Sequence, residues 1–142
     1  MKKPIGKFLL LVMILSAVMA IAAPSQAAGI SWRSSLSSAL SEAKKSRKPV
    51  FIDFTATWCG PCQEMKKTTF KDAKVLSELR KWVSVSVDVD KQEKVASKYK
   101  VEAMPTLMVV KPNGSMVSKA VGYHSSKELL KWLRANYSKA RK

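Results

Sequence analysis

The sequence predicts an α/β fold in which a central mixed β-sheet is flanked by helices on both faces. Stretches with the 3.6-residue spacing of amphipathic helices alternate with short apolar runs rich in β-branched and aromatic residues, a pattern typical of parallel strands joined by helices. The last two strand-like runs are separated only by residues 111–114, whose Asn-Gly pair favours an antiparallel hairpin. With 142 residues, the chain has room for one domain.

The first 27 residues have the pattern of a secretory signal peptide. Three lysines precede an apolar run over residues 8–23, which is shorter than the roughly 20 residues of a membrane-spanning helix. Small residues follow and offer cleavage sites of the Ala-x-Ala type. We therefore expect export to the periplasm, with residues 28–142 as the mature domain. A retained membrane tether is the alternative.

The mature part is predicted to have the element order α-β-α-β-α-β-β-α. The expected helices cover residues 34–47, 59–81 with a break near 68–72, 90–99 and 125–137. The expected strands cover residues 50–56, 83–89, 105–110 and 115–121. Asp90 with Glu93, and Ser125 with Glu128, both fit capping boxes at helix starts.

The chain is strongly basic, with 26 Lys and Arg against 10 Asp and Glu and a formal net charge of +16. No basic-aromatic motif or groove-reading helix accompanies this charge, so nucleic acid is not an expected partner. The lysines are spread along helices, which favours a solvated face. Weak attraction to an anionic membrane surface is the alternative.

The two cysteines lie in Trp58-Cys59-Gly60-Pro61-Cys62, where a predicted strand passes into a helix. Unpaired N–H groups and the dipole at a helix N-terminus favour negative charge, so we expect a lowered pKa for Cys59 and a nucleophilic thiolate. Cys62 follows one turn later on the same face, so the two sulfurs can close a disulfide. Pro61 suits the first helical turn, and Gly60 lets another chain approach closely.

A Cys-x-x-Cys pair also fits half of a zinc site or an inert crosslink. With two cysteines and one histidine, His124, the chain cannot supply the four ligands of a zinc finger, and we expect no metal and no cofactor. A disulfide around two residues closes too small a loop to stabilise the fold much. Redox chemistry is therefore favoured.

Two further features support redox chemistry. Asp53 interrupts an apolar strand six residues before Cys59. Burial would raise its pKa and let it accept a proton from Cys62 through water, whereas an exposed strand position is the alternative. Pro105 opens a second apolar strand, and a cis Met104–Pro105 bond would leave the Met104 backbone available to pair with a substrate strand.

These residues resemble the thioredoxin family: WCGPC after a strand containing Asp53, then Met104-Pro105-Thr106 about 40 residues later. The resemblance covers roughly residues 34–138 and implies the thioredoxin fold. The helical sequence CQEMKKTTFKDAKVLSEL is most similar to the secreted branch that includes the DsbD C-terminal domain.

The resemblance implies Cys59 as attacking thiol, Cys62 as resolving thiol, Asp53 as buried proton acceptor and Pro105 as a cis-proline, with Gly122 near the substrate groove. The expected substrate-binding residues are Trp58, Gly60, Pro61, Met104, Pro105 and Gly122.

Two departures favour a specialised partner over a general disulfide reductase. Thr55 stands where thioredoxin has a second tryptophan, and Ser86 aligns with the lysine that pairs with the buried aspartate.

We expect an exported, monomeric thiol–disulfide oxidoreductase that exchanges a Cys59–Cys62 disulfide or dithiol with protein partners. A reducing role is favoured, with a membrane electron donor or a client protein as partner. The alternatives are a disulfide isomerase or oxidant, and a non-catalytic binding module that uses the groove near Pro105.

Overall fold

The structure is a computed structural model that describes residues 29–142. The predicted signal peptide, residues 1–27, lies outside the described part of the chain. Among the described residues, no helix is long and apolar enough to cross a membrane.

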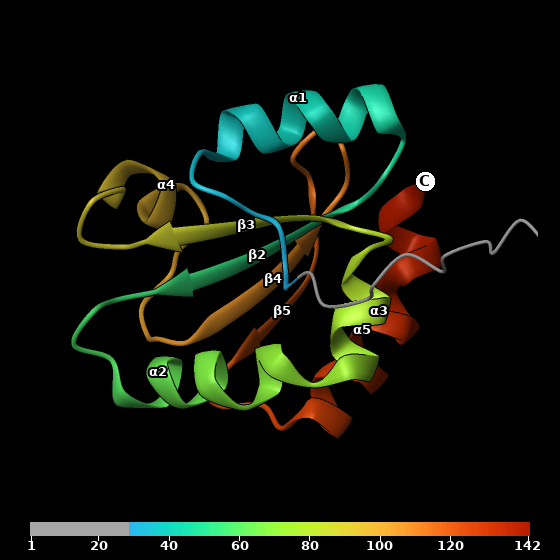
Figure 1. Cartoon of the computed structure of the whole chain (residues 1–142). Coiled ribbons are helices and arrows are strands. Elements are labelled where there is room, and N and C mark those ends of the chain that lie inside the picture. The colour runs from blue at the N-terminus through green and yellow to red at the C-terminus, as the bar shows by residue number, and fades with distance from the viewer. Residues whose placement is uncertain (1–28) are drawn as a thin grey trace, which may run out of the picture.

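One five-stranded mixed sheet forms the centre of the fold, in the strand order β1-β3-β2-β4-β5 (Figure 1). The strands are β1 (Trp32–Arg33), β2 (Val50–Thr55), β3 (Val83–Asp88), β4 (Thr106–Val110) and β5 (Met116–Val121). β1 and β2 run parallel to β3, whereas β4 runs antiparallel to both β2 and β5. The predicted mixed sheet and terminal hairpin are confirmed. The prediction lacks β1, because two residues are too few to show alternation.

Helices cover both faces of the sheet, as predicted (Figure 1). On one face lies α1 (Leu36–Ser46), whose apolar side packs on the sheet with Tyr99, the residue that follows α4 (Glu93–Lys98). The other face is covered by α2 (Gly60–Lys67), η1 (Thr69–Lys71), α3 (Ala73–Leu79) and α5 (Ser126–Arg141). The break predicted near residues 68–72 is confirmed, since η1 interrupts the helix there.

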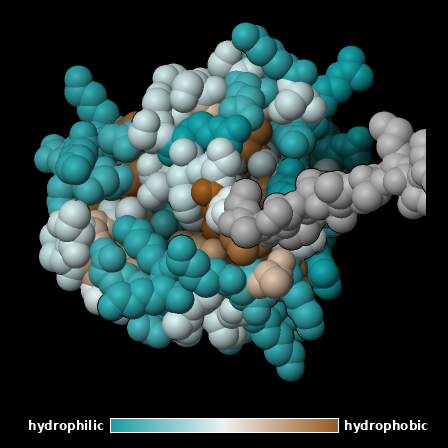
Figure 2. Space-filling model, in the orientation of Figure 1, coloured by the Kyte–Doolittle hydropathy of each residue, from teal (hydrophilic) through white to brown (hydrophobic). Residues whose placement is uncertain are grey.

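Strand β2 is buried along its whole length, because helices lie above and below it. Its side chains alternate between two cores: Ile52 packs in the core beneath α1, and Phe51 packs with Met65 of α2. Asp53 follows Phe51 by two residues, so its side chain lies on the same face of the sheet, the one that α2 covers. In the space-filling view, apolar residues show only in small gaps between hydrophilic ones (Figure 2).

The capping box predicted for Asp90 and Glu93 is wrong. α4 begins at Glu93 after Gln92, which makes no side-chain cap, and Asp90 lies before it in a turn. The carboxylate of Asp90 has another partner, the indole N–H of Trp58, and is therefore not available to the helix.

The capping box predicted for Ser125 and Glu128 is confirmed at the start of α5. The Ser125 hydroxyl accepts the Glu128 N–H, and the Glu128 carboxylate accepts the Ser125 N–H. α5 then runs for 16 residues, about 24 Å at 1.5 Å per residue, to the other end of the sheet.

Candidate active site

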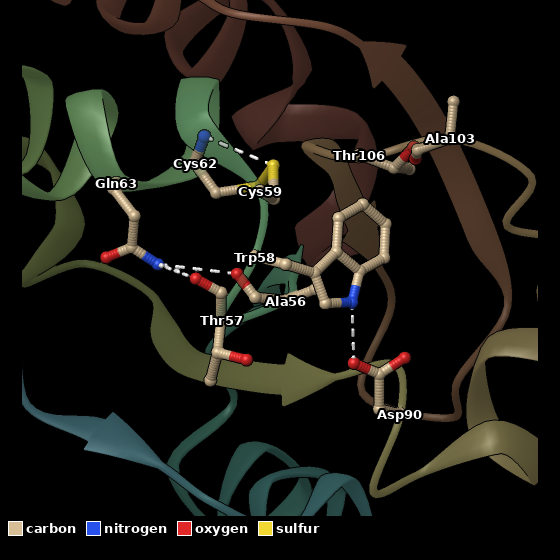
Figure 3. The surroundings of a disulfide bond; sticks show 9 residues. All are labelled: Ala56, Thr57, Trp58, Cys59, Cys62, Gln63, Asp90, Ala103 and Thr106. Atoms are coloured by element: carbon tan, nitrogen blue, oxygen red, sulfur yellow. Dashed lines mark hydrogen bonds between the residues drawn. A yellow bond between two sulfur atoms is a disulfide. The ribbon is translucent and has the colours of Figure 1, made fainter.

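Cys59 and Cys62 form a disulfide where β2 passes into α2. Cys59 is the N-cap residue of α2, and its Sγ accepts a hydrogen bond of 3.3 Å from the Cys62 N–H (Figure 3). Pro61 occupies the first helical turn, where its missing N–H costs no helical bond. The geometry directs a backbone donor at the Cys59 sulfur, which is the arrangement that stabilises a thiolate.

The cysteines themselves are shielded, whereas their neighbours are exposed. Only 4% of the surface of Cys59 and 2% of that of Cys62 is exposed to solvent, whereas Trp58, the residue before Cys59, is 66% exposed. Gly60 and Pro61 are exposed as well. A group that reacts with the sulfur of Cys59 must therefore approach this surface closely.

Two side chains hold the loop before the disulfide in place. The indole of Trp58 donates to Asp90 at 2.8 Å (Figure 3). Gln63, one residue after Cys62, donates from Nε2 to the carbonyl oxygens of Ala56 and Thr57 at 3.3 and 3.4 Å. Sequence reasoning missed Gln63, because an amide in a first helical turn is ordinarily solvated.

The fold brings the predicted proline segment to the disulfide. The Met104–Pro105 peptide bond is cis, and Met104 packs against a small cluster that contains both cysteines. The Gly122 N–H donates to the Pro105 carbonyl at 2.8 Å, which places β5 beside this segment. Gly122 has a φ of 94°, a conformation that favours glycine.

An open groove of about 520 Å³ runs along α4 from Trp58, the residue before Cys59. Its walls include Trp58, Asp90, Val101 and Met104. The predicted substrate-binding residues Trp58 and Met104 thus lie on one surface.

Asp53 is buried in the middle of the sheet with 2% of its surface exposed, which excludes the alternative of an exposed strand position. Burial raises its pKa to about 7, and the positive charge of Lys66 acts in the opposite direction. A carboxyl group with a pKa near neutrality can both take and return a proton at physiological pH.

Lys66 is a residue that sequence reasoning missed. It lies in the last turn of α2, and Cys59, Cys62 and Lys66 follow the i, i+3, i+7 spacing of one helix face. This spacing is the sequence pattern from which Lys66 could have been predicted. Ser86, which pairs with Asp53 in register on β3, has no charge, so Lys66 is the cation that acts on the buried carboxyl group.

The model of the thioredoxin family matches residues 34–135. The chain belongs to the thioredoxin family. Its sheet and helices form the thioredoxin fold, and a thioredoxin of Thermus thermophilus has a similar structure: the TM-score is 0.69 at 27% identity, over 76% of this chain and 87% of that one.

A thioredoxin H-type protein of rice (Oryza sativa subsp. indica) is 43% identical over 83 residues, 58% of this chain. The match spans 65% of the rice protein, just under two thirds of its length. The oxidised C-terminal domain of DsbD from Neisseria meningitidis has a TM-score of 0.63 over 70% of this chain and 90% of that chain. At 24% identity, this last similarity is one of fold.

The thioredoxin site of this chain differs from the family pattern around the buried aspartate. Thr55 stands two residues after Asp53 on the same side of β2, and its hydroxyl is buried without a hydrogen-bond partner among residues 29–142. The cationic neighbour of Asp53 comes from α2 and not from β3. The site therefore combines the family's disulfide with its own electrostatic surroundings.

Proposed function

We propose that this chain is an exported thiol–disulfide oxidoreductase that reduces disulfides of client proteins through Cys59 and Cys62. The observation that carries the proposal is the disulfide at the N-terminus of α2, with the Cys62 N–H directed at Cys59 Sγ. The buried carboxyl group of Asp53, with a pKa of about 7, supports it.

In the first step, the Cys59 thiolate of the reduced protein attacks one sulfur of a client disulfide. A mixed disulfide between Cys59 and the client forms, and the other client sulfur leaves as a thiolate that takes a proton from solvent. The N–H groups at the start of α2 stabilise the attacking thiolate.

In the second step, the Cys62 thiol gives its proton to the Asp53 carboxylate through water and attacks Cys59 Sγ. The Cys59–Cys62 disulfide forms, and the second client sulfur leaves as a thiolate, which is protonated in turn. Two electrons pass from the protein's dithiol to the client. A dithiol donor must then return the protein to its reduced form.

Client binding is assigned to the surface around the disulfide. The exposed side chains of Trp58, Val121 and Tyr123 give this surface apolar area, and Met104 provides backbone groups beside Pro105. An extended client segment can pair with such backbone groups while its cysteine reaches Cys59.

Export and a reducing role complete the proposal. The basic start and apolar run of residues 1–27 support export, and the Gly-Pro pair between the cysteines resembles the reducing members of the family. A dithiol does not stay reduced in an oxidising compartment without an electron supply. We therefore place the chain in the secreted branch that includes the DsbD C-terminal domain, with a membrane electron donor.

Insulin reduction with dithiothreitol as donor tests the activity. The wild-type protein should accelerate insulin precipitation, and Cys59→Ser should abolish the acceleration without changing the melting temperature by more than a few degrees. If wild type and Cys59→Ser gave equal rates of insulin precipitation, the protein would be a non-catalytic binding module.

Two measurements test direction and export. The reduction potential of the Cys59–Cys62 pair, measured in glutathione or dithiothreitol buffers, should lie near the thioredoxin value of about −270 mV; a value near about −120 mV would assign an oxidant. N-terminal sequencing of the protein from a secreting host should begin near residues 23–28. If the protein were found in the membrane fraction with Met1 as its first residue, it would be a membrane-tethered enzyme and not a soluble one.

A further inference from the structure

A cluster of five cations lies at one end of the molecule and comes from three separate segments of the chain. Lys44 and Arg47 end α1, Lys111 begins the turn between β4 and β5, and Arg141 and Lys142 end α5. Together they line a single hollow of about 350 Å³. All but Lys111 are exposed. We call these five residues the basic end.

The basic end lies opposite the disulfide. Val50 pairs with Val83 and with Val110, so the starts of β2 and β3 and the end of β4 meet at the basic end of the sheet. Cys59 follows the other end of β2, about 20 Å away for a strand of six residues. Figure 1 shows the C-terminus near the end of α1, on the side away from the start of α2.

The charge of the basic end is not compensated within the described residues. None of its five side chains forms an ion pair there. Glu42, which lies in α1 with Lys44, is already paired with Arg33. Five like charges around one hollow create a positive potential that attracts a polyanion.

The position of the chain's start favours a membrane as that polyanion. Gly29, the first described residue, lines a neighbouring hollow with Lys48 and Arg80, at the same end of the sheet. In the sequence, only residues 24–28 separate Gly29 from the apolar run 8–23. Fully extended, five residues span at most about 18 Å. Before signal cleavage, or where the run is retained as a tether, a bilayer that holds the apolar run would therefore lie within reach of the basic end.

Nucleic acid fits the basic end less well. Binding of single strands relies on aromatic side chains on which the bases stack, and the residues around this hollow include no aromatic side chain. Tyr137, which lines an adjoining hollow with Arg141 and Lys142, packs edge-on against Trp82. A flat array of anionic headgroups needs only charge of this kind.

We propose that the basic end binds the anionic headgroups of a phospholipid bilayer and holds the disulfide on the side facing away from the membrane. In this orientation, clients reach Cys59 freely, and the protein must leave the bilayer surface before a membrane electron donor can reach the disulfide. The proposal rests on the placement of charge and does not depend on the direction of electron flow.

Co-sedimentation of the full chain with vesicles tests the proposal. One set of vesicles contains phosphatidylcholine alone, and the other contains equal amounts of phosphatidylcholine and phosphatidylglycerol. The triple variant Lys44→Gln, Lys111→Gln, Arg141→Gln removes one charge from each segment. It should lower the preference for anionic vesicles by about tenfold or more, and added salt should weaken wild-type binding.

The matched control is the triple variant Lys67→Gln, Lys94→Gln, Lys127→Gln, which removes the same charge from exposed positions outside the basic end. Its preference for anionic vesicles should fall by less than about threefold. All three proteins share residues 1–28, so the contribution of that segment cancels in the ratio. Equal losses in both variants would overturn the proposal, because net charge alone would then explain binding.

Two further readouts separate the alternatives. Insulin reduction by wild-type protein bound to anionic vesicles should keep at least half of its rate in solution, since the disulfide faces outward. A rate that collapses on binding would contradict the orientation. The wild-type protein could instead bind a single-stranded oligonucleotide more tightly than anionic vesicles, and the basic-end variant could lose that binding. This result would reassign the surface to nucleic acid.

Discussion

The indole N–H of Trp58 donates a hydrogen bond of 2.8 Å to the carboxylate of Asp90, which lies 32 residues further along the chain. This bond ties the loop before the cysteines to the turn before α4 and fixes one wall of the groove beside the disulfide. It also removes Asp90 from the helix cap that its sequence pattern predicts.

Replacement of Asp90 should weaken client binding more than chemistry. In Asp90→Ala, the exposed indole of Trp58 loses its partner and samples other rotamers, so the KM for insulin should rise about two- to tenfold while kcat stays within about twofold. Glu93→Ala is the control, because Glu93 lines the same groove without bonding to Trp58. Similar KM values for the two variants would show that groove charge, and not the indole bond, governs binding.

Stability should fall as the pH rises, because of Asp53. The native protein holds the Asp53 proton up to a pKa of about 7, whereas the unfolded chain releases it near 3.8. Between these values the native state binds more protons, so the free energy of unfolding decreases with pH. Over the whole window this amounts to about 4 kcal/mol.

Asp53→Asn should remove this dependence. The advantage of the variant over wild type, measured by urea unfolding, should grow by about 2–3 kcal/mol between pH 5 and pH 8. The exposed carboxylate Glu102 provides the control, and Glu102→Gln should follow the wild-type curve. If Asp53→Asn keeps the wild-type pH dependence, the Asp53 carboxyl group does not titrate in this window.

Lys66 should tune the pH dependence of turnover. Its positive charge lowers the pKa of Asp53, so Lys66→Gln should raise that pKa further and shift the rising limb of the pH–rate profile to higher pH. Insulin reduction between pH 6 and pH 9 measures the shift. Lys67→Gln, at the exposed neighbouring position, should leave the profile in place. An unshifted profile for Lys66→Gln would remove Asp53 from the proton step.

The two cysteines should differ in reactivity by at least about tenfold at neutral pH. In Cys62→Ala, the remaining Cys59 thiolate at the start of α2 should react rapidly with iodoacetamide and trap mixed disulfides with clients. In Cys59→Ala, Cys62 lies one turn deeper and should react slowly. Mass spectrometry of quenched samples gives both rates, and equal rates would withdraw the assignment of Cys59 as nucleophile.

Much of this fold follows from short-range patterns in the sequence. Short apolar runs rich in β-branched and aromatic residues place the long strands, the Asn-Gly turn places the hairpin, and the Ser125–Glu128 box places the start of α5. The cysteine pair is equally local, because a spacing of three residues at a helix start determines which face both sulfurs share. Such features depend on dihedral preferences and periodicity within a few residues.

Other features depend on contacts between distant segments, and only the tertiary structure decided them. The Asp90 carboxylate could cap the following helix or accept a hydrogen bond from a distant residue, and the approach of Trp58 decided for the second. Gly122 reached Pro105 because β5 pairs with β4.

The electrostatic features belong to this second class. The pKa of Asp53 reflects helix α2 lying over the sheet and Lys66 within it, and the basic end forms where three chain segments meet. Lysines that are spread evenly along a sequence show no cluster, because charge density depends on distance in space. The sequence by itself determined the four long strands, the main helices and the redox pair, whereas packing decided the environment in which that pair would act.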